Sequence, residues 1–207
     1  MQVSICAVKM NSARIQLCLL LTLGLYLCWA TPAEARKYLS RQQAEKVCFP
    51  NAEKIEWKSH RYSMEEIKVI HRNSKLKVID PGIWYGVALK DNKVIGVLAF
   101  DRSIGKHEFI DYVIALTPEG KVKQVEILEY RESWGYEVRR EGWRKQFAGK
   151  SASSKLNLND GIHNISGATL SCRGITEGVK RVCHTWNVVL RPALVAAGRL
   201  PKLADKE

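Results

Sequence analysis

The chain has 207 residues, which is room for one domain with a hydrophobic core and at most a small appendage. Its apolar fraction of 46% and charged fraction of 26% are ordinary for a globular protein. The formal net charge of +12 favours anionic partners, yet Lys and Arg are spread along the chain without a dense basic arm or a known nucleic-acid module. We therefore interpret the charge as a solvated surface and expect no nucleic-acid partner.

Residues 1–35 have the pattern of a signal peptide. Lys9 and Arg14 precede a short apolar run, 17–30, and Ala33-Glu34-Ala35 matches the A-x-A cleavage pattern. This run is shorter than the about 20 residues that a transmembrane helix needs. We therefore expect cleavage after Ala35 and export to the periplasm, with an uncleaved membrane anchor as the alternative.

Cleavage would leave three cysteines, Cys48, Cys172 and Cys183, in a compartment where disulfides persist. Cys172 and Cys183 are eleven residues apart, about three helical turns, so they cannot bond to each other on one continuous helix. A disulfide from Cys48 to either of them and three buried thiols are both open. Because the usual metal-ligand spacing is absent, we expect no metal site.

The segment 36–80 is predicted to be mainly helical. Ser40 and Gln43 form a capping-box pattern that predicts a short helix to about Val47. Ser63 and Glu66 form a second one, with a helix to about residue 72, and residues 55–58 suggest a strand between the two. We interpret the segment as a support for the main domain, without catalytic groups.

Strand patterns dominate the next fifty residues. The runs 84–89 and 94–100 flank a hairpin signal at 90–93, and the runs 109–116 and 122–130 flank a turn at 117–120. A short helix at 143–147 and a polar loop from residue 151 follow. Short antiparallel strands followed by helices predict an α+β fold, an antiparallel sheet with flanking helices.

A run of small residues at 166–171 precedes a predicted helix. Ile175, Val179 and Val182 share one face of a 3.6-residue period, and the helix is expected to reach about residue 190. Thr169 would then lie at or just before the helix N-terminus, where free N–H groups and the helix dipole favour a phosphate. Gly167 has too little side chain to block its approach.

The segment Ser166-Gly167-Ala168-Thr169 before a helix resembles the flavinylation motif of the FMN-binding domain family. That family includes the G subunit of Rnf complexes, the C subunit of sodium-pumping NADH:quinone reductase and small exported flavoproteins. Three further segments occur in the family's order, at 104–108, 130–135 and 146–150, so that the resemblance covers about residues 105–182. It implies an FMN-binding domain at 81–190, followed by a C-terminal tail at 191–207.

In this family FMN is joined through its phosphate to the last Thr of the motif by a separate flavin transferase, which implies attachment at Thr169. The family has an Asp six residues earlier, where this chain has His163. A non-covalent FMN-binding or sensing module is therefore the alternative. The chain itself offers no Ser-His-Asp arrangement that would activate the hydroxyl, so we expect no catalytic residue.

Candidate flavin contacts follow from the resemblance and from residue chemistry. Glu132 and Ser133 match the family's Glu-Thr/Ser pair, which lies against the flavin. The remaining candidates are Ser166, Gly167, Ala168, Leu170, Ser171, Trp134 and Tyr136. Lys106 and Arg173 are candidates to neutralise the phosphate, with a solvated charge as the alternative for each. The competing interpretations are a surface aromatic for Trp134, an arginine pair for Glu132 and a helix cap for Ser171.

The resemblance implies an exported electron-transfer protein, because the flavin itself supplies the redox chemistry. Its partners would be a redox protein or a membrane electron-transport complex, with docking to an acidic partner as a second explanation of the charge. We expect a carrier or a component of a redox complex rather than a stand-alone enzyme, since no G-x-G-x-x-G nicotinamide fingerprint is present. A flavin reductase and a structural domain without flavin are the remaining alternatives.

Overall fold

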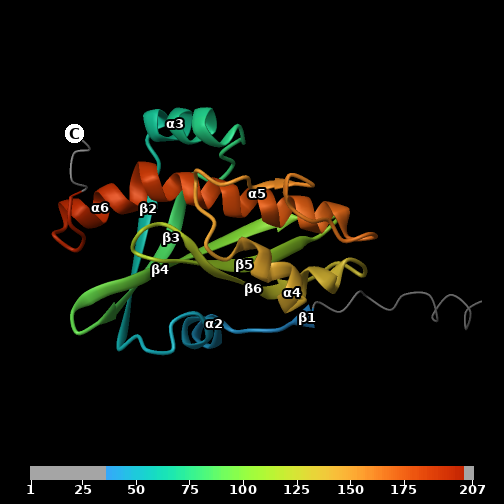
Figure 1. Ribbon diagram of the computed structural model, residues 1–207, viewed down its shortest axis with the longest axis horizontal. Coiled ribbons are helices and arrows are strands. Elements are labelled where there is room, and N and C mark those ends of the chain that lie inside the picture. Colours follow the sequence, from blue (N-terminus) through green and yellow to red (C-terminus); the bar gives the residue numbers. More distant parts are fainter. Residues whose placement is uncertain (1–35, 203–207) are drawn as a thin grey trace, which may run out of the picture. The chain divides into compact units, whose positions relative to one another are not determined.

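The computed structural model describes residues 36–202 and is built on a six-stranded antiparallel sheet (Figure 1). The strand order is β1-β6-β5-β4-β3-β2. The strands are β1 (Arg36–Lys37), β2 (Lys54–Arg61), β3 (Gly82–Lys90), β4 (Lys93–Ile104), β5 (Phe109–Leu116) and β6 (Val122–Tyr130). With helices on both faces, this architecture confirms the predicted α+β fold.

Helix α5 (Thr169–Thr185) crosses one face of the sheet, with α3 (Met64–Ser74) beside it, and α2 (Arg41–Cys48) lies on the opposite face (Figure 1). The remaining helices are short: α4 (Glu141–Arg144), and α6 (Arg191–Ala196), which continues α5 through a wider π-helical turn at Trp186–Leu190. Pro192, which has no N–H to donate, follows directly after this π-helical turn in the first turn of α6, so the helix continues past it with a local change in pitch. A two-stranded pair, β7 (Asn157–Leu158) and β8 (Gly161–Ile162), precedes α5.

The segment before residue 81 supplies both edges of the sheet as well as two helices. Both capping boxes are confirmed, with Ser40 and Ser63 each bonded reciprocally to the residue three positions later. The strand expected at 55–58 is eight residues long and pairs with β3 along its whole length. The charged, weakly alternating sequence of β2 suits a sheet edge and makes its length hard to recognise.

The core consists of two clusters separated by the sheet. Because successive strand residues point to opposite faces, Tyr85, Val97 and Tyr112 pack toward α5, whereas Leu98 and Val113 pack toward α2. Cys48 belongs to the α2 cluster, and the other two cysteines of the described chain belong to the α5 cluster. All three are free and buried, which favours the buried-thiol interpretation, and burial raises the pKa of Cys48 to about 12.

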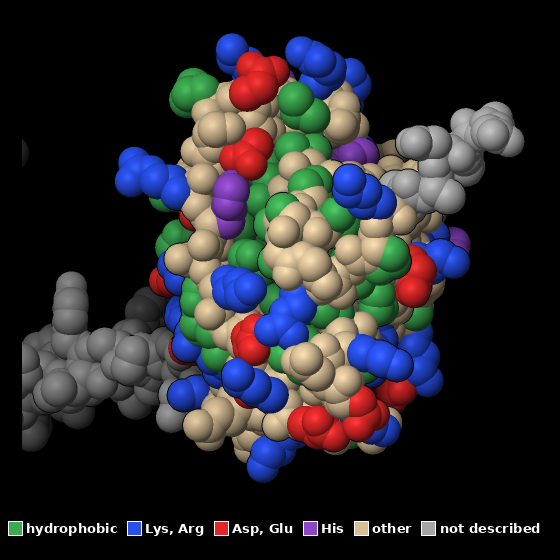
Figure 2. All heavy atoms as spheres, turned by 90° about the vertical axis from the view of Figure 1, so that its left-hand side faces the viewer, with side chains coloured by type: hydrophobic (Ala, Val, Ile, Leu, Met, Phe, Trp, Pro, Cys, Tyr) green, Lys and Arg blue, Asp and Glu red, His purple; other side chains and the backbone are tan. Residues whose placement is uncertain are grey.

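The positive charge is scattered over the face of the molecule that Figure 2 shows. On the face shown in Figure 2, Lys and Arg side chains are interspersed with Asp and Glu and do not gather into one patch. Within residues 36–202, no helix combines the length and the apolar character needed to span a bilayer. The predicted signal peptide lies outside the described residues.

Candidate functional site

The start of α5 is built from the loop at residues 163–168. Thr169 is the first residue of the helix and Ala168 is its N-cap. Gly167 has a φ of 83°, a conformation that favours glycine, although an added Cβ would meet nothing within 4 Å. Glycine is therefore required here by the path of the backbone, which turns the chain into the helix and leaves the space in front of it open.

Thr169 is half-buried, and its hydroxyl has a defined neighbour. The Asn164 side-chain amide donates a hydrogen bond to Thr169 Oγ1 at 2.9 Å. The other amide atom, Asn164 Oδ1, is buried and has no hydrogen-bond partner within the described chain. Sequence reasoning did not single out Asn164, because its contact depends on how the loop folds back and no periodic pattern signals it.

The helix N-terminus next to Thr169 has the character of an anion site. Helix α5 has no side-chain cap and no acidic residue in its first turn, so its first N–H groups stay available. Arg173 and Lys180 lie on the same helix face as Thr169, and all three line a small pocket of about 220 Å³. Of the two predicted phosphate-neutralising residues, Arg173 lies with Thr169 in this pocket, and Lys106 is not part of its lining.

The segment after β6 is held against the start of α5 by a tyrosine. Tyr130 Oη donates to the Trp134 carbonyl at 2.5 Å and shares a hydrogen bond of 2.9 Å with Ser171 Oγ. Gly135 also lies close to this contact, because a Cβ added to Gly135 would be only 3.1 Å from Ser171 Oγ. Ser171 is only 4% exposed, so its hydroxyl joins two segments of the fold rather than capping the helix. Tyr130 is a second residue that the sequence did not signal.

Glu132 organises the turn between β4 and β5. Its carboxylate accepts hydrogen bonds from the backbone N–H groups of His107 and Glu108, the latter at 2.9 Å. Burial opposes ionisation of this group, but the backbone N–H groups outweigh it and hold the pKa of Glu132 below its ordinary value. The backbone turn, and not an arginine, is thus its partner. Ser133, the next residue, is exposed.

Exposed apolar side chains flank the beginning of α5. Trp134 is 82% exposed and Leu170 is 46% exposed. Ile104, at the end of β4, is also exposed. It lies close to α5, because its carbonyl oxygen would be only 3.2 Å from a Cβ added to Gly174, one turn beyond Leu170. Tyr136 is partly covered by Arg36, whose guanidinium lies 5.1 Å from the ring centroid. Apolar surface of this kind is typical of a ligand or partner contact.

These features fit a flat ligand with a phosphate. The uncapped helix end and Arg173 suit the phosphate, and the exposed Trp134 and Leu170 suit an apolar ring. Asn164 is the hydrogen-bond partner of the Thr169 hydroxyl within the described chain, and an amide is not a base. Residues 36–202 also contain no group of three possible metal ligands. Among the described residues, the Thr169 hydroxyl thus has no hydrogen-bond partner that could act as a base.

The chain is similar to a described protein family and to known proteins. The family model described as the FMN-binding domain matches residues 105–184. The G subunit of the proton-translocating ferredoxin:NAD(+) oxidoreductase complex of Clostridium ljungdahlii is 32% identical over 104 residues, which cover 47% of this chain and 56% of that protein. The chain thus spans about half the length of this relative. The crystal structure of Shewanella oneidensis NqrC aligns with a TM-score of 0.48 and 14% identity, over 77% of this chain and 91% of that chain.

Proposed function

Because residues 105–184 belong to the FMN-binding domain family, we propose that this chain is an exported electron-transfer protein whose FMN is linked through its phosphate to Thr169. FMN is the cofactor of this domain family, and the flavin supplies the redox chemistry when it is bound. The observation that carries the proposal is the position of Thr169, with its hydroxyl at an uncapped helix N-terminus beside Arg173. The proposal also includes a signal peptide at residues 1–35 and an FMN-binding domain at residues 81–190.

In this arrangement each part of the cofactor has a counterpart in the chain. The first N–H groups of α5 and Arg173 neutralise the phosphate. The exposed Trp134 and Leu170 offer apolar area to the ring, and Ser133 is an exposed hydroxyl next to them. Glu132 acts indirectly, because its carboxylate holds the 105–108 turn that adjoins this surface.

Attachment replaces the hydrogen of the Thr169 hydroxyl by the phosphorus of FMN. Thr169 Oγ1 would lose its proton and form the bond to phosphorus, while the phosphoanhydride bond of the flavin donor would break and its leaving group would take up that proton. Asn164 orients Oγ1 for this step, while a separate flavin transferase supplies the base and the flavin donor. The chain is then the substrate of the transferase, and in its own work it is an electron carrier or a component of a redox complex.

The name of the Clostridium ljungdahlii relative places it in a proton-translocating oxidoreductase complex. We propose a redox partner of the same kind here, a membrane electron-transport complex or a protein that exchanges electrons with one. An exposed flavin site suits such exchange, since the apolar surface around Trp134 is open to a docking protein.

The test of this proposal is the intact mass of the chain after co-production with a flavin transferase and denaturation. We expect a mass increase of one FMN less one water, which Thr169→Val removes completely. Ser153→Ala, which deletes an exposed hydroxyl of the preceding polar loop, is the matched control and keeps the adduct. Flavin released on denaturation would instead support the non-covalent alternative, and the absence of flavin in any form would leave a structural domain.

A second prediction concerns His163, which stands where the family has an Asp. Its backbone is fixed by bonds to Gln146 and Trp143, at 2.7 and 2.8 Å, while its side chain is exposed. His163→Asp therefore changes what a transferase meets without changing the loop. Since a hydrogen bond to a charged group contributes about 1.5–3 kcal/mol, we expect adduct formation at least about tenfold faster. The control Asn159→Asp places an exposed carboxylate at the wrong distance from Thr169 and should leave the rate of adduct formation unchanged. A rate that rises as much for Asn159→Asp as for His163→Asp would show that the position of the carboxylate does not matter.

A further inference from the structure

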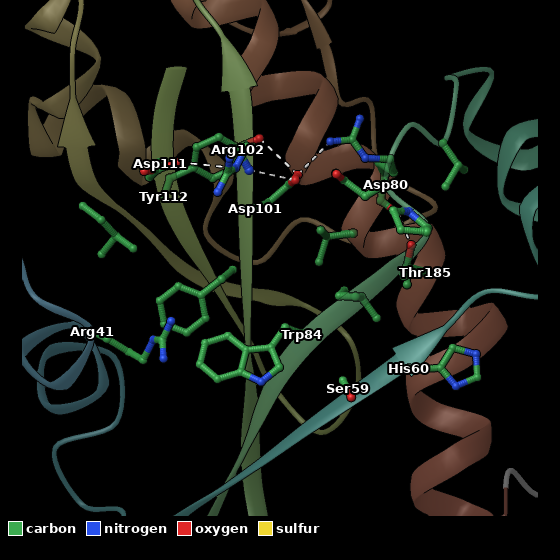
Figure 3. Close-up of a pocket in the computed structure, with 18 of the residues that line it drawn as sticks. Arg41, Ser59, His60, Asp80, Trp84, Asp101, Arg102, Asp111, Tyr112 and Thr185 are labelled. Atoms are coloured by element: carbon green, nitrogen blue, oxygen red, sulfur yellow. Dashed lines mark hydrogen bonds and ion pairs between the residues drawn. The ribbon is translucent and has the colours of Figure 1, made fainter. Parts of the chain in front are cut away.

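The sheet splits at one corner. Strands β3 and β4 pair from Lys90 and Lys93 as far as Tyr85 and Ala99. Beyond that point β3 continues to Gly82 with β2 as its partner, and β4 continues to Ile104 with β5 as its partner. A pocket of about 770 Å³ opens where the two strands part, lined from both faces of the sheet (Figure 3). Its size is that of a site for a small organic ligand.

One side of the pocket is aromatic. The half-buried rings of Trp84 and Phe100 lie 5.5 Å apart, and Trp57 stacks behind Trp84 at 4.3 Å. The guanidinium of Arg41, from the first turn of α2, lies 3.7 Å from the Trp84 ring centroid (Figure 3). On the α5 side, the apolar Val182 continues this wall. Trp84, Phe100 and Val182 thus give the pocket an apolar and aromatic lining, with the Arg41 guanidinium over the Trp84 ring.

The other side of the pocket holds a charged group with unused hydrogen-bond donors. Arg181, on α5, forms an ion pair with Asp101 through Nη2 at 2.8 Å. Tyr112 Oη donates to the same Asp101 oxygen at 3.1 Å. Within the described chain, Nη1 and Nε of Arg181 have no hydrogen-bond partner, although the side chain is only 17% exposed. A guanidinium with two free donor nitrogens, here Nη1 and Nε, is suited to bind both oxygens of a carboxylate.

The charges around the pocket favour an anion. Two of its acids, Asp111 and Glu129, are balanced by two arginines: Arg131 pairs with both, at 2.7 and 2.8 Å, and the lining residue Arg102 pairs with Asp111 at 3.7 Å. Three of its cations have no acidic partner among residues 36–202: Lys37, Arg41 and Arg61. Asp80 is the one lining acid outside any ion pair of the described residues. The balance of free charge is therefore positive.

We propose that this pocket is a second ligand site, which binds a small aromatic carboxylate with its ring against Trp84 and Phe100 and its carboxylate on Arg181. The site is separate from the flavin site, because Arg181 and Thr169 are twelve residues apart on one helix, about 18 Å along its axis. Neither the family match nor the electron-transfer proposal depends on it.

The test is calorimetric titration of the full chain with 2-naphthoate, beside the uncharged 2-naphthylmethanol. We expect saturable one-to-one binding of the carboxylate and at least about tenfold weaker binding of the alcohol, the loss of one charged hydrogen bond. Arg181→Lys keeps a cation beside Asp101 but removes the guanidinium, and should raise the Kd for 2-naphthoate at least about tenfold. Arg144→Lys is the matched control, since Arg144 is equally buried and paired with Glu126 outside the pocket.

A second variant tests the location independently. Ser59→Trp adds bulk at the exposed, lining position on β2 that pairs with Trp84, and should abolish binding without touching the ion pair. Thr169→Val should bind 2-naphthoate like the unmodified chain, because it changes only the flavin site. No saturable binding would overturn the proposal, and so would binding that survives both Arg181→Lys and Ser59→Trp in variants with unchanged melting temperatures.

Discussion

Replacing Arg181 by leucine is expected to lower the free energy of unfolding at pH 7 by about 3–5 kcal/mol, the usual cost of leaving a buried charge without its partner. The carboxylate of Asp101 is 9% exposed, and Arg181 is its ion-pair partner at 2.8 Å. Tyr112 would stay as a hydrogen-bond donor, but a neutral hydroxyl does not balance a full charge. The loss is therefore dominated by the unpaired carboxylate and not by the missing side-chain contacts.

The same variant should show a characteristic pH dependence. Burial raises the pKa of Asp101 above its ordinary value of 3.8 even though Arg181 opposes the shift, and removal of Arg181 raises it further. A group whose pKa is raised in the folded state stabilises the fold below its unfolded pKa and loses that contribution as the pH rises through its folded pKa. The free energy of unfolding of the variant should thus be closest to that of the unmodified protein at acid pH, and the difference between the two should grow from about pH 4 upward.

Urea unfolding from pH 4 to pH 8 measures both effects. The double variant Arg181→Leu with Asp101→Asn removes the charge on both sides and should recover most of the lost stability, with little pH dependence. An Arg181→Leu variant that loses the same free energy at every pH would contradict the role assigned to Asp101. Stability equal to that of the unmodified chain at pH 7 would contradict the ion pair itself.

Gly178→Ala is expected to destabilise the protein by about 3 kcal/mol, at the upper end of the usual cost of overpacking. Gly178 lies where α5 crosses the sheet, and an added Cβ would overlap the Tyr112 hydroxyl and lie 2.8 Å from Asp101 Oδ2. Tyr112 is buried and held by its hydrogen bond to Asp101, so its ring cannot move aside. The helix would have to shift away from β5.

Thermal and urea unfolding of three variants tests this explanation. Tyr112→Phe removes the hydroxyl that the new methyl group would strike, so it should restore part of the stability of Gly178→Ala while destabilising the unmodified chain. Gly142→Ala in α4 is the matched control, because its Cβ would meet nothing within 4 Å, and it should be neutral or slightly stabilising. Additive effects of Gly178→Ala and Tyr112→Phe would rule out the clash.

The sequence predicted those features that depend on neighbours in the chain. Ser40 and Ser63 identify two helix starts because a capping box lies within four residues. Runs of strand-forming residues on either side of turn signals predicted the four central strands, and the period of Ile175, Val179 and Val182 predicted the helix that begins at Thr169. The small residues before that helix also carried the family resemblance, which the match at 105–184 bears out.

Only the tertiary structure decided how distant residues meet. The Asn164 contact with Thr169 depends on the path of a loop, and the Ser171 contact with Tyr130 depends on how α5 lies against β6. The full length of β2 was hidden because an edge strand tolerates charged residues that weaken its pattern.

The ion pair of Asp101 and Arg181 joins residues that are 80 positions apart in the sequence. The split between β3 and β4 exists because, where the two strands part, β3 stays paired with β2 and β4 stays paired with β5. Local patterns thus determined which elements form and where a phosphate is expected. The register of the sheet and the crossing of α5 over it determined which charges are buried together and where the second pocket opens, because both follow from packing between segments that the sequence does not place side by side.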